Sequence, residues 1–190
     1  MRKRFEEFSL SLNPDKTRVI EFGRFAADRR EQRGLGKPET FNFLGFTFIC
    51  GRSRKGGFLL RRKSRRDRIR GKLKEVKEEL RRRMHRTIAE QGQWLRQVVG
   101  GFFAYHAVPT NSRTVAAFRY CVLDLWRRSL QRRSQTDGTT WTRIAKIAND
   151  FLPKPRILHP WPNQRFAVRH PRWEPYAGKP HVRICAGGAQ

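Results

Sequence analysis

Apolar residues recur every three or four positions through the middle of the chain, and this spacing predicts a series of helices. The first pattern begins at Ser64 and carries basic residues on its other faces. Further helices are predicted over about 93–106, 112–133 and 141–151. Because the connections between them are short, the helices should pack as an up-and-down bundle. The apolar stripe of the first helix consists of Ile69, Leu73, Val76 and Leu80.

A glycine pair, Gly100-Gly101, interrupts the second helical pattern. A glycine in a helix interior costs about 1 kcal/mol relative to alanine. We therefore expect another part of the fold to pack closely against this pair. Helix caps are predicted from the polar side chains that precede the third and fourth patterns, namely Asn111 or Ser112 and Thr139 or Thr140.

The first 62 residues carry strand patterns instead. The segment 17–22 is predicted as a strand, whereas 23–40 is polar and rich in glycine, which is typical of a loop. The strongest strand prediction covers 41–50, with Gly45 as a bulge or a point of close backbone approach. A third strand is expected at 58–60.

Prolines recur from Pro153 to the end of the chain and prevent any long regular element there. The same segment holds Trp161, Phe166 and Trp173, which makes it too apolar for a free linker. We expect an irregular, basic, Pro-rich tail that folds onto the bundle or onto RNA.

The charge of the chain bears on its partners. Its 190 residues include 43 lysines and arginines against 16 aspartates and glutamates, a formal net charge of +27. Self-repulsion at that charge opposes compaction, and a polyanion such as nucleic acid relieves it. The apolar runs are too short to span a membrane, and the basic start lacks the apolar stretch of a secretory signal. Three scattered cysteines give neither a disulfide framework nor a metal-binding pair.

Three stretches of sequence then stand in a recognisable order. They are Leu-Ser-Leu-Asn-Pro-Asp-Lys-Thr at 10–17, Phe-Asn-Phe-Leu-Gly-Phe at 41–46, and Trp-Leu-Arg-Gln-Val-Val-Gly-Gly-Phe-Phe-Ala-Tyr-His at 94–106. The last is followed by Arg119-Tyr120 and Trp126-Arg127-Arg128. In this order and spacing they resemble the C-terminal half of a bacterial group II intron reverse transcriptase, the intron-encoded maturase. The resemblance covers essentially the whole chain.

That resemblance implies an α+β fold in three parts. Residues 1–62 match the truncated end of the reverse transcriptase palm and would supply short β-strands. Residues 63–152 match the thumb, also called the maturase-specific or X domain, and would form the all-α bundle. Residues 153–190 form the irregular tail.

The chain departs from the family at the catalytic centre. In the family, a Tyr-Ala-Asp-Asp box holds two Mg²⁺ ions that activate the primer hydroxyl, but this sequence contains no Asp-Asp pair. We therefore expect no complete catalytic site, no cofactor in this chain and no polymerase activity from the chain alone. Lys16 matches a lysine that approaches the phosphates of the incoming nucleotide in related polymerases. Its alternative interpretation is an exposed turn lysine.

Two sets of residues are candidates for RNA contacts. Residues 43–46 resemble the primer grip, a hairpin that presses on the primer end. The alternative is a plain β-core strand, and both can hold because alternate residues of a strand face opposite ways. The basic run 61–68 would bind the RNA backbone, or would be a solvated helix face. The aromatic residues of the thumb are expected mainly in the core. The candidates are Phe43, Leu44, Gly45 and Phe46 for the primer grip, and Arg61, Arg62, Lys63, Arg65, Arg66, Arg68, Arg70, Tyr105, His106, Arg119, Arg127 and Arg128 for RNA binding.

The sequence thus predicts an RNA-binding part of a group II intron reverse transcriptase/maturase. It would assist splicing and mobility by gripping intron RNA and the RNA template–DNA primer duplex, in the cytoplasm and in association with the nucleoid. A separate palm-containing chain is a further candidate partner, and no membrane is expected to take part. Two alternatives stay open: a stand-alone splicing factor acting in trans, and a general basic RNA-binding protein such as a ribosome-associated one.

Overall fold

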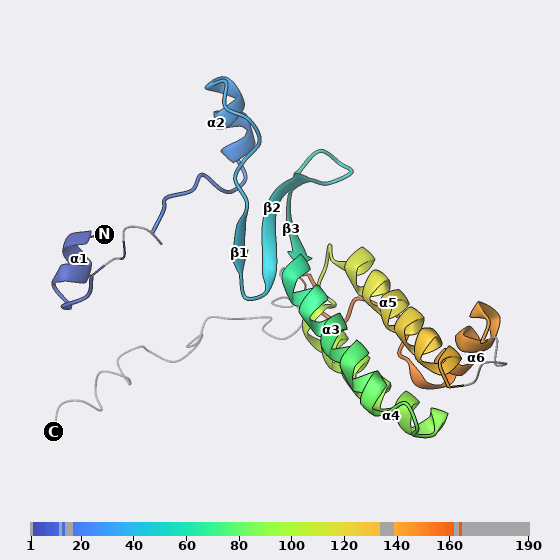
Figure 1. Cartoon of the computed structure of the whole chain (residues 1–190). Helices are drawn as coiled ribbons and strands as arrows, with labels where there is room; N and C mark the ends of the chain where they lie inside the picture. The colour runs from blue at the N-terminus through green and yellow to red at the C-terminus, as the bar shows by residue number, and fades with distance from the viewer. Residues whose placement is uncertain (1, 12, 14–16, 134–138, 162–163, 165–190) are drawn as a thin grey trace, which may run out of the picture. The chain divides into compact units, whose positions relative to one another are not determined.

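The computed structural model describes residues 2–11, 13, 17–133, 139–161 and 164, and it confirms an α+β fold. The chain divides into two compact units, residues 1–65 and 66–190. The first unit contains α1 (Arg2–Glu6), α2 (Ala26–Gln32), β1 (Phe41–Phe43), β2 (Phe46–Arg52) and β3 (Phe58–Ser64). The second contains α3 (Arg66–Arg82), α4 (Ile88–His106), α5 (Ser112–Gln131) and α6 (Trp141–Phe151) (Figure 1).

The strands form an antiparallel sheet in the order β1-β2-β3, and β1 and β2 are joined by a two-residue turn. Phe43 pairs with Phe46, and the intervening Leu44 and Gly45 have φ angles of 45° and 75°. Two positive φ angles define a type I′ turn, whose twist matches that of the flanking strands. The prediction of one continuous strand over 41–50 with a bulge is therefore wrong, because Gly45 helps to reverse the chain.

Phenylalanine rings form the core of the first unit. Directly paired residues of antiparallel strands share a face of the sheet, so Phe41 and Phe48 lie together. Their rings stack with centroids 5.0 Å apart, and Phe22 meets Phe41 edge-on at 4.8 Å. Phe46, which points to the same face, is buried. The alternation predicted from the sequence thus yields an aromatic cluster on a small sheet.

Two predictions for the first unit are wrong. Residues 17–22 form no strand. Val19 is 99% exposed, so the apolar side chain that suggested a strand is not buried against a sheet, and Phe22 meets β1 through its ring rather than through a backbone ladder. The segment 23–40 is not wholly a loop, because α2 occupies part of it. The run of alanine and long charged residues between Gly23 and Gly34 has good helix propensity, which outweighs the flanking glycines.

The second unit is built around an apolar core shared by its four described helices. The stripe predicted on the first helix is confirmed, since Val76 and Leu80 of α3 are 1% exposed and Ile69 and Leu73 pack against the core. Trp126 and Phe118 of α5 are the largest buried side chains. Figure 1 shows α3 running beside α4 and α5.

The helix boundaries differ in part from those predicted. α4 begins at Ile88, five residues earlier than expected, because Thr87 and Glu90 form a capping box that satisfies two backbone N–H groups. The hydroxyl of Thr140 caps α6 as predicted, accepting from the Arg143 N–H at 3.3 Å. Asn111 occupies the N-cap position of α5, but its side chain donates to the carbonyl of His106 instead.

The glycines of α4 behave unlike the prediction. A Cβ atom added at Gly100 or Gly101 would meet nothing within 4 Å, so no element packs closely against this pair. The close approach occurs more than two turns earlier, at Gly92. A Cβ there would lie 2.5 Å from the ring of Phe151, so Gly92 allows α6 to rest on α4. The sequence pattern correctly predicted a close contact at a glycine of this helix, but the contact is at Gly92 and not at Gly100 or Gly101.

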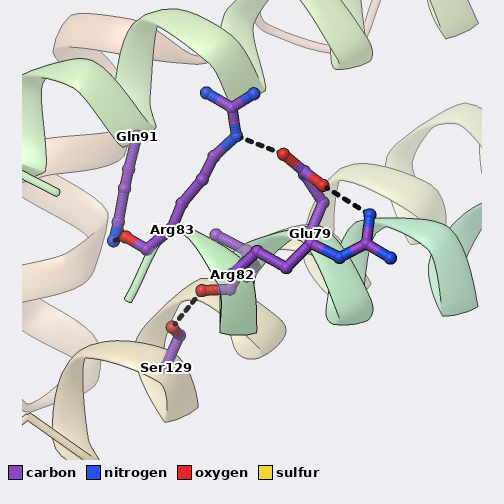
Figure 2. Close-up of polar contacts among 6 residues, drawn as sticks. Glu79, Arg82, Arg83, Gln91 and Ser129 are labelled. Atoms are coloured by element: carbon purple, nitrogen blue, oxygen red, sulfur yellow. Dashed lines mark hydrogen bonds and ion pairs between the residues drawn. The ribbon is translucent and has the colours of Figure 1, made fainter. Parts of the chain in front are cut away.

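A buried amide joins three segments where α3 ends and α4 begins. Gln91 is fully buried; its Oε1 accepts from Trp126 Nε1 at 2.8 Å, and its Nε2 donates to the carbonyl of Arg83 at 2.6 Å. Close by, the hydroxyl of Ser129 donates to the carbonyl of Leu80. Figure 2 shows Gln91 and Ser129 at this junction together with the Glu79 carboxylate, which pairs with Arg82 and Arg83.

The described part of the tail, residues 153–161, is irregular as predicted and lies against the end of α4. The N–H groups of Leu158 and His159 both donate to the carbonyl of Ala107, at 2.9 and 3.2 Å. The rest of the predicted tail lies outside the described residues, apart from Gln164. No helix among the described residues is long and apolar enough to cross a membrane.

The buried amide gives a first prediction. Gln91→Leu should lower the free energy of unfolding by about 1–3 kcal/mol, because it removes the partner of the buried Trp126 N–H. The Arg83 carbonyl also loses a hydrogen bond but keeps the one from the Arg86 N–H at 3.0 Å. Urea denaturation of the full chain measures the change. Gln93→Leu, at an exposed position of the same helix, is the matched control and should change stability by less than about 0.5 kcal/mol.

A double-mutant cycle separates this hydrogen bond from packing. Adding Trp126→Phe to Gln91→Leu removes both partners, so the double variant should be at least about 1 kcal/mol more stable than the sum of the two single changes predicts. Strict additivity of the two substitutions would contradict the role given to the bond.

Candidate nucleic-acid interface

The two sides of α3 differ in charge: the side toward α4 carries both acidic and basic residues, whereas the residues of α3 that line cavities toward α5 are basic where they are charged. Its four acidic residues, Asp67, Glu75, Glu78 and Glu79, all line cavities on the side of α4. Lys74, Lys77 and Arg81 instead line cavities on the side of α5. Arg66 and Arg70 continue this basic stripe by spacing, since positions three or four apart share a helix face. One helix therefore separates two surfaces of different electrostatic character.

The α5 side of this helix is a basic face. Arg128 and Arg132 of α5 line the same cavity as Lys77 and Arg81. We name Lys74, Lys77, Arg81, Arg128 and Arg132 together the α3–α5 basic face. In the described part of the chain, Lys77, Arg81 and Arg132 make no ion pair, so their charges are not neutralised by the protein.

Two carboxylates meet the α3–α5 basic face, and both are already engaged: Glu78 pairs with Lys74 at 4.0 Å, and Asp124 pairs with arginines of α5. Asp124 accepts from Arg127 at 2.9 Å and pairs with Arg128 at 2.8 Å. Both are local pairs within α5, three and four residues apart. Asp124 thus orients two arginines on the helix without cancelling the positive charge of the face.

Two exposed aromatic rings border the α3–α5 basic face. Tyr120 is 61% and Trp141 is 41% exposed, and their rings stack with centroids 5.2 Å apart and an angle of 9°. The guanidinium of Arg127 lies 4.8 Å from the centre of the Trp141 ring. Tyr120 was among the aromatic residues expected to show a polar tip at the surface, and it is exposed. The expectation that Trp141 belongs to the core is wrong, because Trp141 is the first residue of α6 and packs on the exposed ring of Tyr120.

On the opposite side of α3, a groove of about 670 Å³ runs between α3 and α4. We name it the α3–α4 groove. Gly71 of α3 and Gly101 of α4 line it, and a Cβ at either position would meet nothing within 4 Å. The two absent side chains widen the space between the helices. The other lining residues are Asp67, Arg68, Lys72, Glu75, Gln97, Val98, Phe102, Tyr105 and His106.

The floor of the α3–α4 groove ends at a cluster of rings. The ring of Phe102 lies 4.3 Å from that of His106, which in turn meets Tyr105 edge-on at 4.9 Å. Tyr105 is 50% exposed, whereas His106 is half-buried. Burial lowers the pKa of the His106 imidazole, so this group stays neutral at pH 7.

The structure distributes the candidate residues over two units. In the first unit, Phe43 and Leu44 are 57% and 66% exposed at the tip of the β1–β2 hairpin, with Gly45 and buried Phe46 beside them. The basic run 61–68 is divided between two elements, so the alternative that it forms a solvated helix face is wrong. Arg61, Arg62 and Lys63 belong to β3, and Arg65 follows that strand. Lys16 lies outside the described residues.

In the second unit, Arg66, Arg68 and Arg70 lie at the beginning of α3, and Arg68 shares the α3–α4 groove with Tyr105 and His106. Two of the candidate residues on α5, Arg119 and Arg127, make hydrogen bonds within the protein. Arg119 donates to the carbonyl of Pro153 and is half-buried, which lowers its pKa. Arg127 holds Asp124 and Gln131. Arg128 is exposed on the α3–α5 basic face.

Several residues of these surfaces were missed by the candidate list. Lys77, Arg81 and Arg132 could have been found, because Lys77 and Arg81 continue the spacing of Arg70 along α3. Gly71 could not have been found, because an isolated glycine in a helical pattern does not indicate which part of the fold it faces. Among the described residues, no group of three or more histidine, cysteine, aspartate or glutamate side chains could hold a metal ion.

The burial of His106 generates a second prediction. An unfolded histidine titrates near pH 6.5, and the folded one titrates below that value. As pH falls through 6.5, the unfolded chain binds more protons, so the free energy of unfolding decreases until the pH passes the folded pKa.

Urea denaturation between pH 7.5 and 5.5 measures this decrease. His106→Gln should remove most of it, whereas His85→Gln, at an exposed position between α3 and α4, should keep the wild-type dependence. An unchanged pH dependence in His106→Gln would assign the effect to other groups.

Comparison of the chain with protein-family models, with curated proteins and with solved structures gives no significant match.

Proposed function

We propose that this chain is an RNA-binding part of a group II intron reverse transcriptase/maturase, and that its helical unit binds the RNA backbone. The observation that supports RNA binding is the α3–α5 basic face, where Lys77, Arg81 and Arg132 carry charges that no described acidic residue offsets. Unpaired cations aligned on a rigid surface are the arrangement that phosphate contacts require.

The shape of the α3–α5 basic face favours binding to the backbone of structured RNA over recognition of a base sequence. Lys74, Lys77 and Arg81 follow one face of a straight helix, at intervals of about 5–6 Å. Double-stranded RNA is bound mainly through its backbone and shape, because its deep major groove excludes side chains. The row of cations on α3 would contact one stretch of RNA backbone, and Arg128 and Arg132 of α5 would contact a neighbouring stretch.

The Tyr120–Trp141 pair adds a stacking surface at the edge of the α3–α5 basic face. Aromatic rings stack on bases at the ends and loops of RNA helices, and each such contact is worth about 1–3 kcal/mol. The pair would therefore favour RNA with an exposed terminal or loop base over an uninterrupted duplex.

The assignment to group II introns rests on the resemblance of the three sequence stretches. Splicing assistance and the grip on template–primer are the activities that this resemblance implies, within a ribonucleoprotein in the cytoplasm. The two Mg²⁺ ions of the family belong to a Tyr-Ala-Asp-Asp box that this sequence does not contain. Polymerisation would thus require a catalytic palm that these 190 residues do not contain.

Removal of cations tests the α3–α5 basic face. With about 6–10 phosphate contacts, the logarithm of the association constant should fall with log salt with a slope of roughly −5 to −9. The triple variant Lys77→Gln/Arg81→Gln/Arg132→Gln should bind roughly 30-fold more weakly at about 0.1 M salt, and its slope should be smaller by about 2–3.

The matched control removes three charges elsewhere. Lys146→Gln/Lys154→Gln/Arg156→Gln replaces exposed cations of α6 and the segment after it. It should lose less than about 3-fold in affinity and keep the salt slope within about 1 of the wild type. If both triple variants lost the same affinity, binding would be explained by non-specific electrostatic attraction and not by a defined interface.

The intron assignment has its own experiment. The purified chain should bind a group II intron RNA at least about 10-fold more tightly than an unrelated structured RNA of equal length at the same salt concentration, and should accelerate splicing of a precursor that contains that intron. Equal affinity for the two RNAs without any effect on splicing would favour a general basic RNA-binding protein.

A further inference from the structure

From the α3–α4 groove we infer a second, base-reading site: it accepts one unstacked RNA base that carries an exocyclic amino group, such as cytosine or adenine. This inference rests on the proposed RNA binding and adds a specificity element to it. The α3–α5 basic face would hold the backbone, and the groove on the other side of α3 would receive a base that projects from it.

The shape of the groove is the first argument. Its volume of about 670 Å³ falls within the range of sites that bind small molecules, and it is open to solvent. Gly71 and Gly101 create this volume, and each costs about 1 kcal/mol of helix stability. Because nothing packs within 4 Å of either Cβ position, that cost is not compensated by close packing of the helices. The open space itself is what the two glycines provide.

The chemistry of the lining is the second argument. Arg68 and Lys72 are matched by Asp67 and Glu75, so the groove has no excess charge that would select a phosphate. Lys72 is in fact paired with Glu75 at 2.8 Å. The groove instead presents donors and acceptors side by side, including the amide of Gln97. A base edge is the part of RNA that offers both kinds of group at once.

The position of the rings is the third argument. Tyr105 lines the groove and is half-exposed, and it is held edge-on by His106. Sequence-specific RNA-binding sites bind unstacked bases by stacking them on aromatic side chains and by hydrogen bonds to their edges. The Tyr105 ring supplies the first contact, and the carboxylates of Asp67 and Glu75 accept hydrogen bonds from an amino group. Uracil lacks this amino group and would lose that interaction.

Binding to a set of RNA hairpins tests the inference. The probes share one stem and carry a single bulged cytosine, a bulged adenine, a bulged uracil or no bulge. The wild-type chain should bind the cytosine or adenine bulge at least about 10-fold more tightly than the uninterrupted stem, and the uracil bulge within about 3-fold of that stem.

Filling the groove should abolish this preference without loss of the fold. Gly71→Leu and Gly101→Leu place a side chain in open space and improve helix propensity, so both variants should be at least as stable as the wild type. Their affinity for the uninterrupted stem should stay within about 3-fold. Gly100→Leu, beside the groove but outside its lining, is the matched control and should retain the preference.

The carboxylates have a separate readout. Glu75→Gln keeps the size of the side chain but replaces an acceptor pair with an amide, so the discrimination between cytosine and uracil bulges should fall to less than about 3-fold. A preference that survives Gly71→Leu and Gly101→Leu would overturn the inference, as would wild-type binding of all four hairpins with equal affinity. Absence of binding to every hairpin would instead overturn the proposed RNA binding, and this inference with it.

Discussion

The buried amide of Gln91 fixes the arrangement on which both surfaces of the helical unit depend. It bridges the indole of Trp126 in α5 and the carbonyl of Arg83 just after α3, and it does so from within α4. A buried amide left without partners costs about 1–3 kcal/mol, so only one relative placement of these segments is acceptable. Apolar packing alone would tolerate small rotations of α3. Such rotations would exchange the residues that face α4 and α5.

That placement converts a sequence of mixed charge into two distinct surfaces. Read along the chain, α3 alternates basic and acidic residues with no obvious order. Once its apolar stripe is packed, Glu75, Glu78 and Glu79 fall on one side, and Lys77 and Arg81 fall on the other. The ion pairs of α3 and α5 join residues three or four apart and are worth only a few tenths of a kcal/mol each. They stiffen individual helices, whereas the core and the Gln91 amide hold the helices together.

The sequence predicted the apolar stripe of α3, the helical unit and the cap at Thr140, because each depends on local spacing or on a local hydrogen bond. It failed where the outcome depends on a distant partner. The segment around Val19 has strand-like composition but its Val19 side chain is exposed and not packed on a sheet, and Gly101 was expected in a contact that Gly92 makes instead. The α3–α4 groove could not be predicted, since it arises from two glycines thirty residues apart that face the same space.

The net charge of +27 links the stability of the chain to the function proposed for it. With 43 basic residues and 16 acidic ones, ion pairs within the chain can neutralise fewer than half of the cations. The remaining repulsion opposes folding, and it is greatest where unpaired cations such as Lys77, Arg81 and Arg132 are brought together. A ligand that binds only the folded state stabilises it in proportion to the logarithm of its concentration over its dissociation constant. A polyanion on the α3–α5 basic face would both relieve this repulsion and add that binding energy. The feature that weakens the isolated fold is therefore the one that would make it strongest in complex with RNA.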